Sequence, residues 1–260
     1  MAPEDPPGFV VRTEAQKAAF ERGFRIERGI EGPWIHYAST TAPTEIWIAG
    51  GGPAGPWFLG MDHRGVATEF GPGIQLPGPG VSRYVFPTLI GLYDALNRTW
   101  RLARSLPTAP LAQFERATAG LPRVTEVERL TVQRVGQDIF RAALLDYWGG
   151  RCPLTGISDP ALLRASRIVP WAECDTDAHR LDVHNGLLLS ALWDAAFDAG
   201  LVSFADDGAL LTAAALSPVA AGILNNSRMT PAPLSFTDAH QQNMRRHRSR
   251  HGFSPDPPSG

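Results

Sequence analysis

The sequence has few cysteines and no long apolar run, and each shortage excludes a class of protein. Cys152 and Cys174 are too few for a disulfide framework, and neither lies in a CxxC pair that could bind zinc, so we expect two reduced thiols. No apolar run could span a bilayer, and the first residues, MAPEDPPGF, lack the basic and apolar parts of an export signal. We therefore expect a cytoplasmic protein without a membrane-spanning segment.

The chain also lacks a surplus of positive charge. Its formal net charge of −2 argues against a protein that coats nucleic acid without specificity, because counterion release needs many cationic contacts. Lys17 is the only lysine, so the basic groups are mainly arginines, which suit bidentate phosphate contacts; a GC-rich genome would give the same bias. Two basic clusters, Arg98 with Arg101 and Arg104, and the tail at 245–251, could be phosphate-binding surfaces or solvated charged faces.

The first half of the chain predicts a small domain with antiparallel strands. A chain of 260 residues with 43% hydrophobic content suits one large domain or two small ones, and we favour two. Short segments rich in aromatic and branched residues predict strands at 34–38, 45–49 and 57–61, and a fourth at 66–70. The fold class expected is α+β, with a small mixed domain at 1–110.

Helix signals flank these strands. A capping box of Thr13 and Gln16 predicts a first helix that ends near residue 24, and an amphipathic pattern predicts a long helix at 87–106. The glycine- and proline-rich segment 71–80 predicts an exposed loop. Prolines then separate this half from the second.

Four aromatic residues of this half invite two interpretations. Trp34, Trp47, Trp57 and Phe58 lie on or beside the predicted strands. They could stack on a flipped or modified base, or they could form the core of a small sheet, which is the commoner use. The sequence leaves both open.

A glycine-rich stretch offers a competing function. Residues 48–55, IAGGGPAG, satisfy the GxGxxG pattern of dinucleotide-binding folds directly after a predicted strand. That pattern binds pyrophosphate only when a helix begins at the turn. The residues that follow, PWFLGMDHRG, have strand-like aromatics and no helical period, so we predict a loop between antiparallel strands and no dinucleotide cofactor.

The second half carries the most informative segment. A capping box of Thr125 and Glu128 predicts a helix that reaches Tyr147. From Tyr147 the chain reads YWGGRCPLTGISDPALLRASRIVPW and, after a polar spacer, LDVHNGLLLSALWDAAFDAGLVSF. A turn at 205–208, ADDG, predicts a hairpin after it.

This second half resembles the HNH endonuclease family, in particular restriction-type members. The resemblance covers about a hundred residues, and its blocks occur in the family's order. They are Arg134, Gly136, Gln137, Phe140 and Arg141; Cys152, Thr155 and Gly156; Leu163, Ala165, Ile168 and Pro170; Asn185, Gly186, Leu187 and Leu189; Phe197, Asp198, Gly200 and Leu201; and His247 with Arg248. The resemblance implies a helical region at 111–260 that contains a ββα-metal core at 147–204, and a DNA-recognition or sensing role for 1–110.

The resemblance also implies the parts of a nuclease site. Asn185 matches the family's central asparagine, which fixes the strand that carries the base; an ordinary Asn-Gly turn is the alternative. Asp194 stands where we place the family's last histidine, and Asp198 follows one helical turn later. Both carboxylates suit Mg²⁺ or Mn²⁺, although a helix-surface aspartate would look the same. Arg164, His247 and Arg248 are the expected DNA-binding side chains, beside Arg167.

Arg167 is the main departure, because it stands at the position of the general-base histidine. A guanidinium stays protonated and cannot take a proton from water, but it binds phosphate well. Three alternatives follow. Either the site holds DNA without cutting it, or a neighbour such as His184 or His179 supplies the base. Otherwise Arg167 is a substitution in this one sequence within a family group that is otherwise active.

The function expected is therefore a metal-dependent HNH-type DNA endonuclease of restriction or defence, with impaired catalysis as an open option. The alternative is a DNA-binding or sensing protein that retains the fold without catalysis. DNA is the expected partner, a homodimer is an open possibility, and no membrane is involved.

Overall fold

The protein is α+β and divides into two compact units. The computed structural model describes residues 2–122, 124–229 and 232–253. The first unit ends at Ala109 and the second begins at Pro110, within helix α4 (Thr108–Thr118). No helix in the described part of the chain is both long and apolar enough to cross a membrane.

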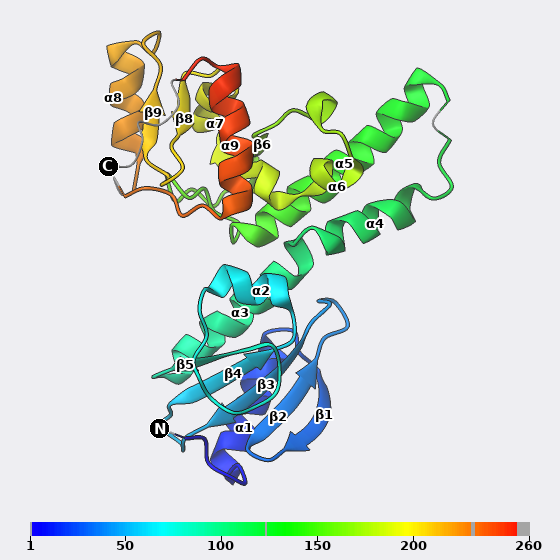
Figure 1. The fold of residues 1–260 in the computed structure, drawn as a ribbon, viewed down its shortest axis with the longest axis vertical. Helices are drawn as coiled ribbons and strands as arrows, with labels where there is room; N and C mark the ends of the chain where they lie inside the picture. Colours follow the sequence, from blue (N-terminus) through cyan, green and yellow to red (C-terminus); the bar gives the residue numbers. More distant parts are fainter. Residues whose placement is uncertain (1, 123, 230–231, 254–260) are drawn as a thin grey trace. The chain divides into compact units, whose positions relative to one another are not determined.

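The first unit is built on a five-stranded antiparallel sheet in which each strand pairs with its neighbour in the sequence (Figure 1). The three strands predicted at 34–38, 45–49 and 57–61 are confirmed, and an unpredicted strand lies at each edge of the sheet. The strands are β1 (Ile26–Glu31), β2 (Trp34–Ala38), β3 (Glu45–Gly50), β4 (Trp57–Met61) and β5 (Ser82–Phe86).

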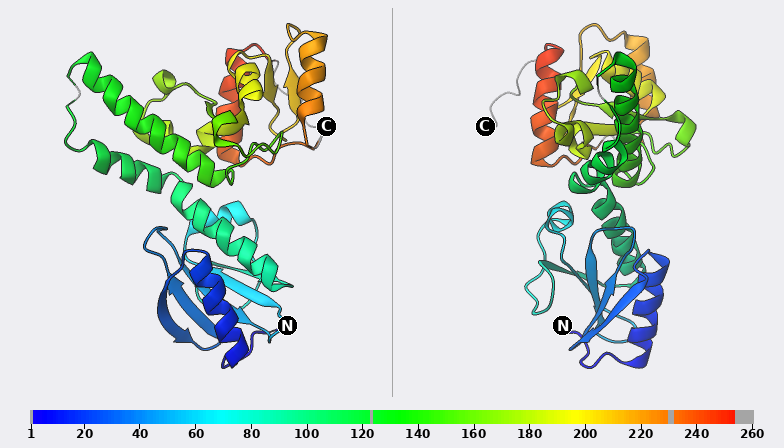
Figure 2. Two further views of the ribbon diagram at one scale, coloured as in Figure 1. Left: turned by 180° about the vertical axis from the view of Figure 1, so that it is seen from behind. Right: turned by 90° about the vertical axis from the view of Figure 1, so that its right-hand side faces the viewer.

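Two helices cover one face of this sheet. Helices α1 (Phe9–Glu21) and α3 (Leu89–Ser105) lie side by side on it (Figure 2). Tyr37 and Ile48 are buried under them. Helix α3 is close to the predicted 87–106, whereas α1 begins at Phe9, and the Thr13 hydroxyl donates to the Phe9 carbonyl inside it. The predicted capping box at Thr13 is therefore wrong.

The 71–80 segment lies against the other face, as the predicted loop. Trp34 and Phe58 are buried there and pack with Ile74 of this loop, and Trp57 is buried on the helix-covered side. The Trp47 ring stacks on His36, with ring centroids 4.4 Å apart. The structure thus uses the tryptophans and Phe58 as packing for the sheet.

The segment at 66–70 is not a strand. It belongs to helix α2 (Arg64–Phe70), which begins where Nδ1 of His63 accepts a hydrogen bond from the backbone N–H of Val66, at 3.2 Å. A histidine cap of this kind satisfies one of the free N–H groups of the first turn. The short apolar pattern of VATEF does not distinguish a strand from one helical turn.

The glycine-rich stretch connects two antiparallel strands, as predicted. Residues 51–56 join β3 to β4, and the Gly51 N–H donates to the Pro56 carbonyl at 2.8 Å. No helix begins at this turn. The geometry that a dinucleotide pyrophosphate requires is therefore missing from this loop.

The second unit packs helices around two short hairpins. The Thr125–Glu128 capping box is present at the start of its longest helix and confirms that prediction. Its helices are α5 (Glu126–Tyr147), α6 (Asp177–Leu181), α7 (Ala191–Asp198), α8 (Pro218–Ser227) and α9 (Asp238–Arg250), with short 3₁₀ turns η1 (Pro160–Leu162), η2 (Trp171–Glu173) and η3 (Val183–Asn185). Its strands are β6 (Leu163–Arg167) with β7 (Gly186–Ser190), and β8 (Val202–Phe204) with β9 (Leu210–Thr212), the latter pair joined by the predicted turn at 205–208.

Candidate functional site

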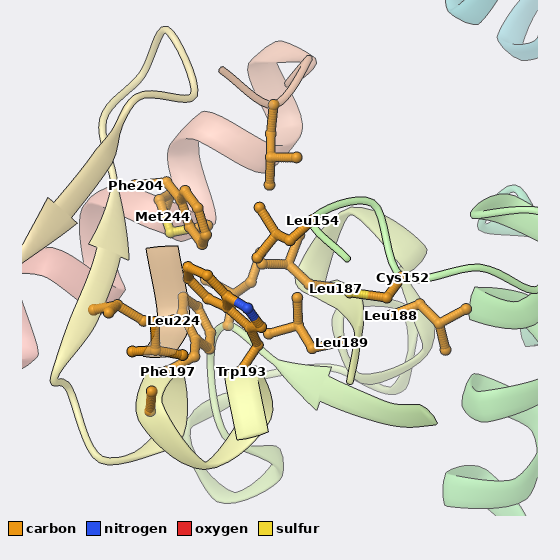
Figure 3. Packing of buried hydrophobic residues seen from close by; sticks show 14 of the residues in the cluster. Cys152, Leu154, Leu187, Leu188, Leu189, Trp193, Phe197, Phe204, Leu224 and Met244 are labelled. Carbon is orange, nitrogen blue, oxygen red and sulfur yellow. The ribbon is translucent and has the colours of Figure 1, made fainter. Parts of the chain in front are cut away.

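A ββα unit forms the centre of the second unit. Strands β6 and β7 pair antiparallel, with Arg167 opposite Gly186, and α7 follows β7 directly. All five residues of β7 are buried. Figure 3 shows Trp193 and Phe197 of α7 in one cluster with the leucines of β7, and this cluster fixes the helix across the hairpin.

Asn185 connects the two strands through its side chain. It is fully buried, and its amide oxygen accepts from the backbone N–H of Val169 at 2.8 Å. Its amide nitrogen donates to the Val169 carbonyl at 3.1 Å, and it lies 3.5 Å from the His179 carbonyl and 3.4 Å from the Cys174 sulfur. These contacts hold the chain just after Arg167, so they set where β6 ends.

Arg167 is a fixed cation in the structure. Its guanidinium carbon lies 3.8 Å from the centre of the Phe140 ring and 5.0 Å from that of Trp171, and Nη1 donates to the Arg180 carbonyl. Burial is the main cause that lowers the Arg167 pKa, to about 10. The group is therefore still protonated near neutral pH and cannot act as a general base there.

Arg167 faces a small pocket of about 190 Å³. A second hollow, of about 610 Å³, shares Arg250 with it and carries two further arginines of α9. The first pocket is lined by Arg167, Pro170, Trp171, Asp198, His247, Arg250 and His251, and the second by Val169, Glu173, Arg245, Arg246, Ser249 and Arg250.

Acidic side chains neutralise only part of this basic surface. Arg250 pairs with Glu173, and Arg245 pairs with Asp206. Arg246 is exposed on the same helix. Anions would therefore meet arginine groups along α9 next to Arg167.

The two expected metal ligands lie one turn apart on α7, and only Asp198 lines the Arg167 pocket. Burial is the main cause that raises the pKa of Asp194; the charge of Asp198 adds to it, and a hydrogen bond from Ser166 opposes it. Across residues 2–122, 124–229 and 232–253, no group of three or more His, Cys, Asp or Glu side chains is placed to hold a metal ion. The described side chains thus do not fit a preassembled metal centre.

The histidines named as substitute bases lie away from the pocket lining. His184 is nearly buried; its Nδ1 is 2.8 Å from Oδ1 of Asp182, and its ring packs on those of Tyr147 and His240. His179 uses Nε2 to contact the side-chain oxygen of Asn243 at 2.9 Å. The structure does not bring either histidine to the surface that Arg167 faces.

His247 and Arg248 lie inside the second unit. Nε2 of His247 donates to the Phe197 carbonyl at 3.0 Å, and the Ser203 hydroxyl is 3.0 Å from its Nδ1. Arg248 is 4% exposed; it donates to the Phe204 carbonyl at 2.7 Å and to Asp206 at 2.8 Å. These contacts stabilise the packing of α9, and so little exposed surface leaves Arg248 poorly placed for a DNA phosphate.

The other expected DNA contact, Arg164, is exposed on β6, where Nη1 donates to the carbonyls of Ala161 and Leu163.

Sequence reasoning did not assign His251 or Trp171 to the site. The helical spacing of the tail was the available signal, because His247 and His251 lie one turn apart and their rings are 4.5 Å apart.

Gly136 of α5 lets Trp171 approach and support Arg167. A methyl group at Gly136 would collide with the Trp171 indole and lie 3.3 Å from the Phe114 ring. We expect Gly136→Ala to lower the free energy of unfolding of this unit by about 1 to 2 kcal/mol, because the clash outweighs the better helix propensity of alanine.

The two cysteines report on this unit alone, because both are buried and lie within it. Maleimide labelling of Cys152 at increasing urea concentrations therefore measures how much Gly136→Ala lowers the free energy of unfolding of this unit. The matched control is Gly222→Ala on α8, where an added methyl group meets no atom within 4 Å. It should be neutral or slightly stabilising, and an equal loss in both variants would contradict the proposed role of Gly136.

Residues 152–205 match the model of a known family, described as HNH endonuclease. A search of curated proteins found no match. The matched segment contains β6, β7 and α7, and therefore the ββα unit with Arg167 and Asn185. The C-terminal half thus contains a segment that is similar to HNH endonucleases, as the resemblance implied.

Proposed function

We propose that the C-terminal unit binds duplex DNA through the phosphate backbone, and that hydrolysis at its HNH core is strongly impaired. The observation that carries this proposal is Arg167, a guanidinium held against two aromatic rings. By resemblance, it stands at the position of the general base. A group that stays protonated near neutral pH can neutralise a phosphate but cannot activate water. By resemblance, the setting is restriction or genome defence, and we place it in the cytoplasm.

The arginines of α9 extend this surface. Arg246 is exposed, and Arg250 lines both hollows next to Arg167. Arginine forks match the geometry of phosphate oxygens, and each phosphate contact releases counterions from DNA. One chain on the duplex is enough for these contacts, without a homodimer.

The second candidate function is a DNA endonuclease that depends on a divalent ion, Mg²⁺ or Mn²⁺. One observation favours it: the carboxylate of Asp198 and the imidazole of His251 line the Arg167 pocket. Asp194 and Asp198 are the side chains that would hold the ion, together with substrate phosphate, because Mg²⁺ often takes only one or two carboxylates from a protein. We rank this candidate second because Arg167, a protonated guanidinium, stands where the resemblance places the general base, and such a group cannot activate water.

Salt dependence of duplex binding tests the proposal. We expect Arg246→Ala to reduce the slope of log K against log salt by about 0.9, the value for one lost phosphate contact. Fluorescence anisotropy with a labelled duplex at several salt concentrations gives this slope.

The control is Arg134→Ala, which removes the same charge from an exposed position on α5. It should leave the slope unchanged. Failure of the full 260-residue chain to bind duplex DNA, or equal slopes for Arg246→Ala and the unmodified chain, would overturn the assignment of this surface.

A further inference from the structure

The first unit contains a hollow of about 470 Å³ at the edge of its sheet. Strand β5 is the edge strand, and the hollow lies among β5, the chain that follows α2, and α3. Its volume is within the range of small-molecule sites. The lining residues are Phe70, Pro72, Ile74, Tyr84, Val85, Phe86, Gly91, Asp94, Ala95 and Arg98.

The aromatic wall of this hollow is fixed by hydrogen bonds. The Tyr84 hydroxyl is 3.0 Å from the Ala67 carbonyl and 3.1 Å from the Gly71 carbonyl, and it donates to this pair. The Tyr84 ring lies 5.1 Å from the Phe70 ring, centre to centre. Phe86 lines the hollow from the end of β5 and is partly exposed. The buried Tyr84 ring packs against Phe70, and the partly exposed rings of Phe70 and Phe86 are the ones that a flat ligand can reach.

Two charged side chains of α3 add polar groups to this wall. The Arg98 guanidinium carbon lies 4.6 Å from the centre of the Phe70 ring, and Nη2 donates to the Glu69 carbonyl at 2.6 Å. A guanidinium carries five N–H donors, more than this one contact uses. Asp94, one turn earlier, is exposed and contributes a carboxylate acceptor.

These features select a flat, polar ligand. Aromatic rings stack on the face of any nucleobase, and a carboxylate accepts hydrogen bonds from an exocyclic amino group, as cytosine carries and thymine lacks. An arginine N–H can donate to a ring carbonyl or to a phosphate. An aliphatic ligand would make no hydrogen bond to Asp94.

We propose that this hollow binds an unpaired nucleobase that bears an exocyclic amino group, with Phe70 and Phe86 as stacking surface and Asp94 and Arg98 as polar contacts. The inference deepens the proposed DNA binding by naming what the first unit recognises. The base comes either from an extruded or single-stranded position in DNA or from a free nucleotide.

Binding of labelled oligo-dC and oligo-dT, of about eight nucleotides each, to the full chain tests this inference. We expect oligo-dC to bind about tenfold more tightly than oligo-dT, and Asp94→Asn to remove this preference. We expect Arg98→Ala to weaken oligo-dC binding about tenfold. Arg28→Ala, an exposed arginine on β1 at the opposite edge of the sheet, is the control for loss of charge and should have no effect.

The outcomes separate this inference from the proposed function. Equal binding of the two oligonucleotides, or equal effects of Arg98→Ala and Arg28→Ala, would overturn the nucleobase site even if duplex binding holds. A preference for oligo-dC that Asp94→Asn removes would support the site even if duplex binding fails. Displacement of oligo-dC by dCMP identifies a free nucleotide as sufficient, and lack of displacement shows that the ligand must be part of a DNA chain.

Discussion

Asn185→Ala is expected to lower the free energy of unfolding of the C-terminal unit by about 3 to 4 kcal/mol, because it removes bonds from several buried groups at once. The Asn185 amide satisfies both the N–H and the carbonyl of Val169 and contacts Cys174. Alanine leaves these groups buried without their partner. Urea denaturation followed by maleimide labelling of Cys152, which is not among the hydrogen-bond partners given above for the Asn185 side chain, measures the loss.

The control is Asn226→Ala on the exposed side of α8, where we expect a change within about 0.5 kcal/mol. A loss of less than about 1 kcal/mol for Asn185→Ala would contradict the idea that this side chain fixes the end of β6. The same variant should also weaken duplex binding, because the position of Arg167 depends on that strand.

Acid should destabilise the same unit through His247, with an effect of about 2 to 3 kcal/mol between pH 6.5 and pH 4. Burial is the main cause that lowers the His247 pKa from 6.5 to about 4; the bond to the Phe197 carbonyl opposes this, and nearby His251 adds to it. The folded protein therefore holds this histidine neutral, with Nε2 as donor and Nδ1 as acceptor from Ser203.

The sign of this pH dependence follows from which state takes up the proton first. Because the folded pKa is lower than the unfolded one, the unfolded chain binds a proton first as the pH falls. The stabilising contribution is complete above about pH 6.5 and is lost as the pH falls towards 4.

A pH series of urea denaturation curves for the unmodified chain and for His247→Gln tests this expectation. The variant should be less stable near neutral pH, and its stability should change less between pH 6.5 and pH 4. An equally steep loss in both proteins would assign the acid sensitivity to other groups.

Local sequence signals predicted much of the first unit, and their failures have physical causes. The three central strands carry aromatic and branched residues because both of their faces are covered, so the pattern was readable. Strand β1 lies at an edge and is largely exposed, with the polar sequence IERGIE. The helix that contains 66–70 was not predicted because its cap is the ring of His63. Histidine is an uncommon capping residue, so the sequence carries no usual signal for a helix start there.

The site was predictable in outline but not in its contacts. The position of Arg167 on the first strand and of Asn185 before the second follows from the order of motif blocks. The partners of Arg167 do not, because Phe140 and Arg180 reach it from separate helices. Nor does sequence reveal that His247 and Arg248 are buried, since a basic tail on a helix looks the same whether it faces solvent or the core.

Nicking of supercoiled plasmid by the purified full chain with Mg²⁺ or Mn²⁺, at protein concentrations that saturate DNA binding, tests the central claim most directly. We predict no nicking above the level of Asp194→Ala; activity that appears only in Arg167→His would identify position 167 as the missing base. Clear nicking by the unmodified chain that Asp194→Ala abolishes would contradict the account and establish a working nuclease with Arg167 in place.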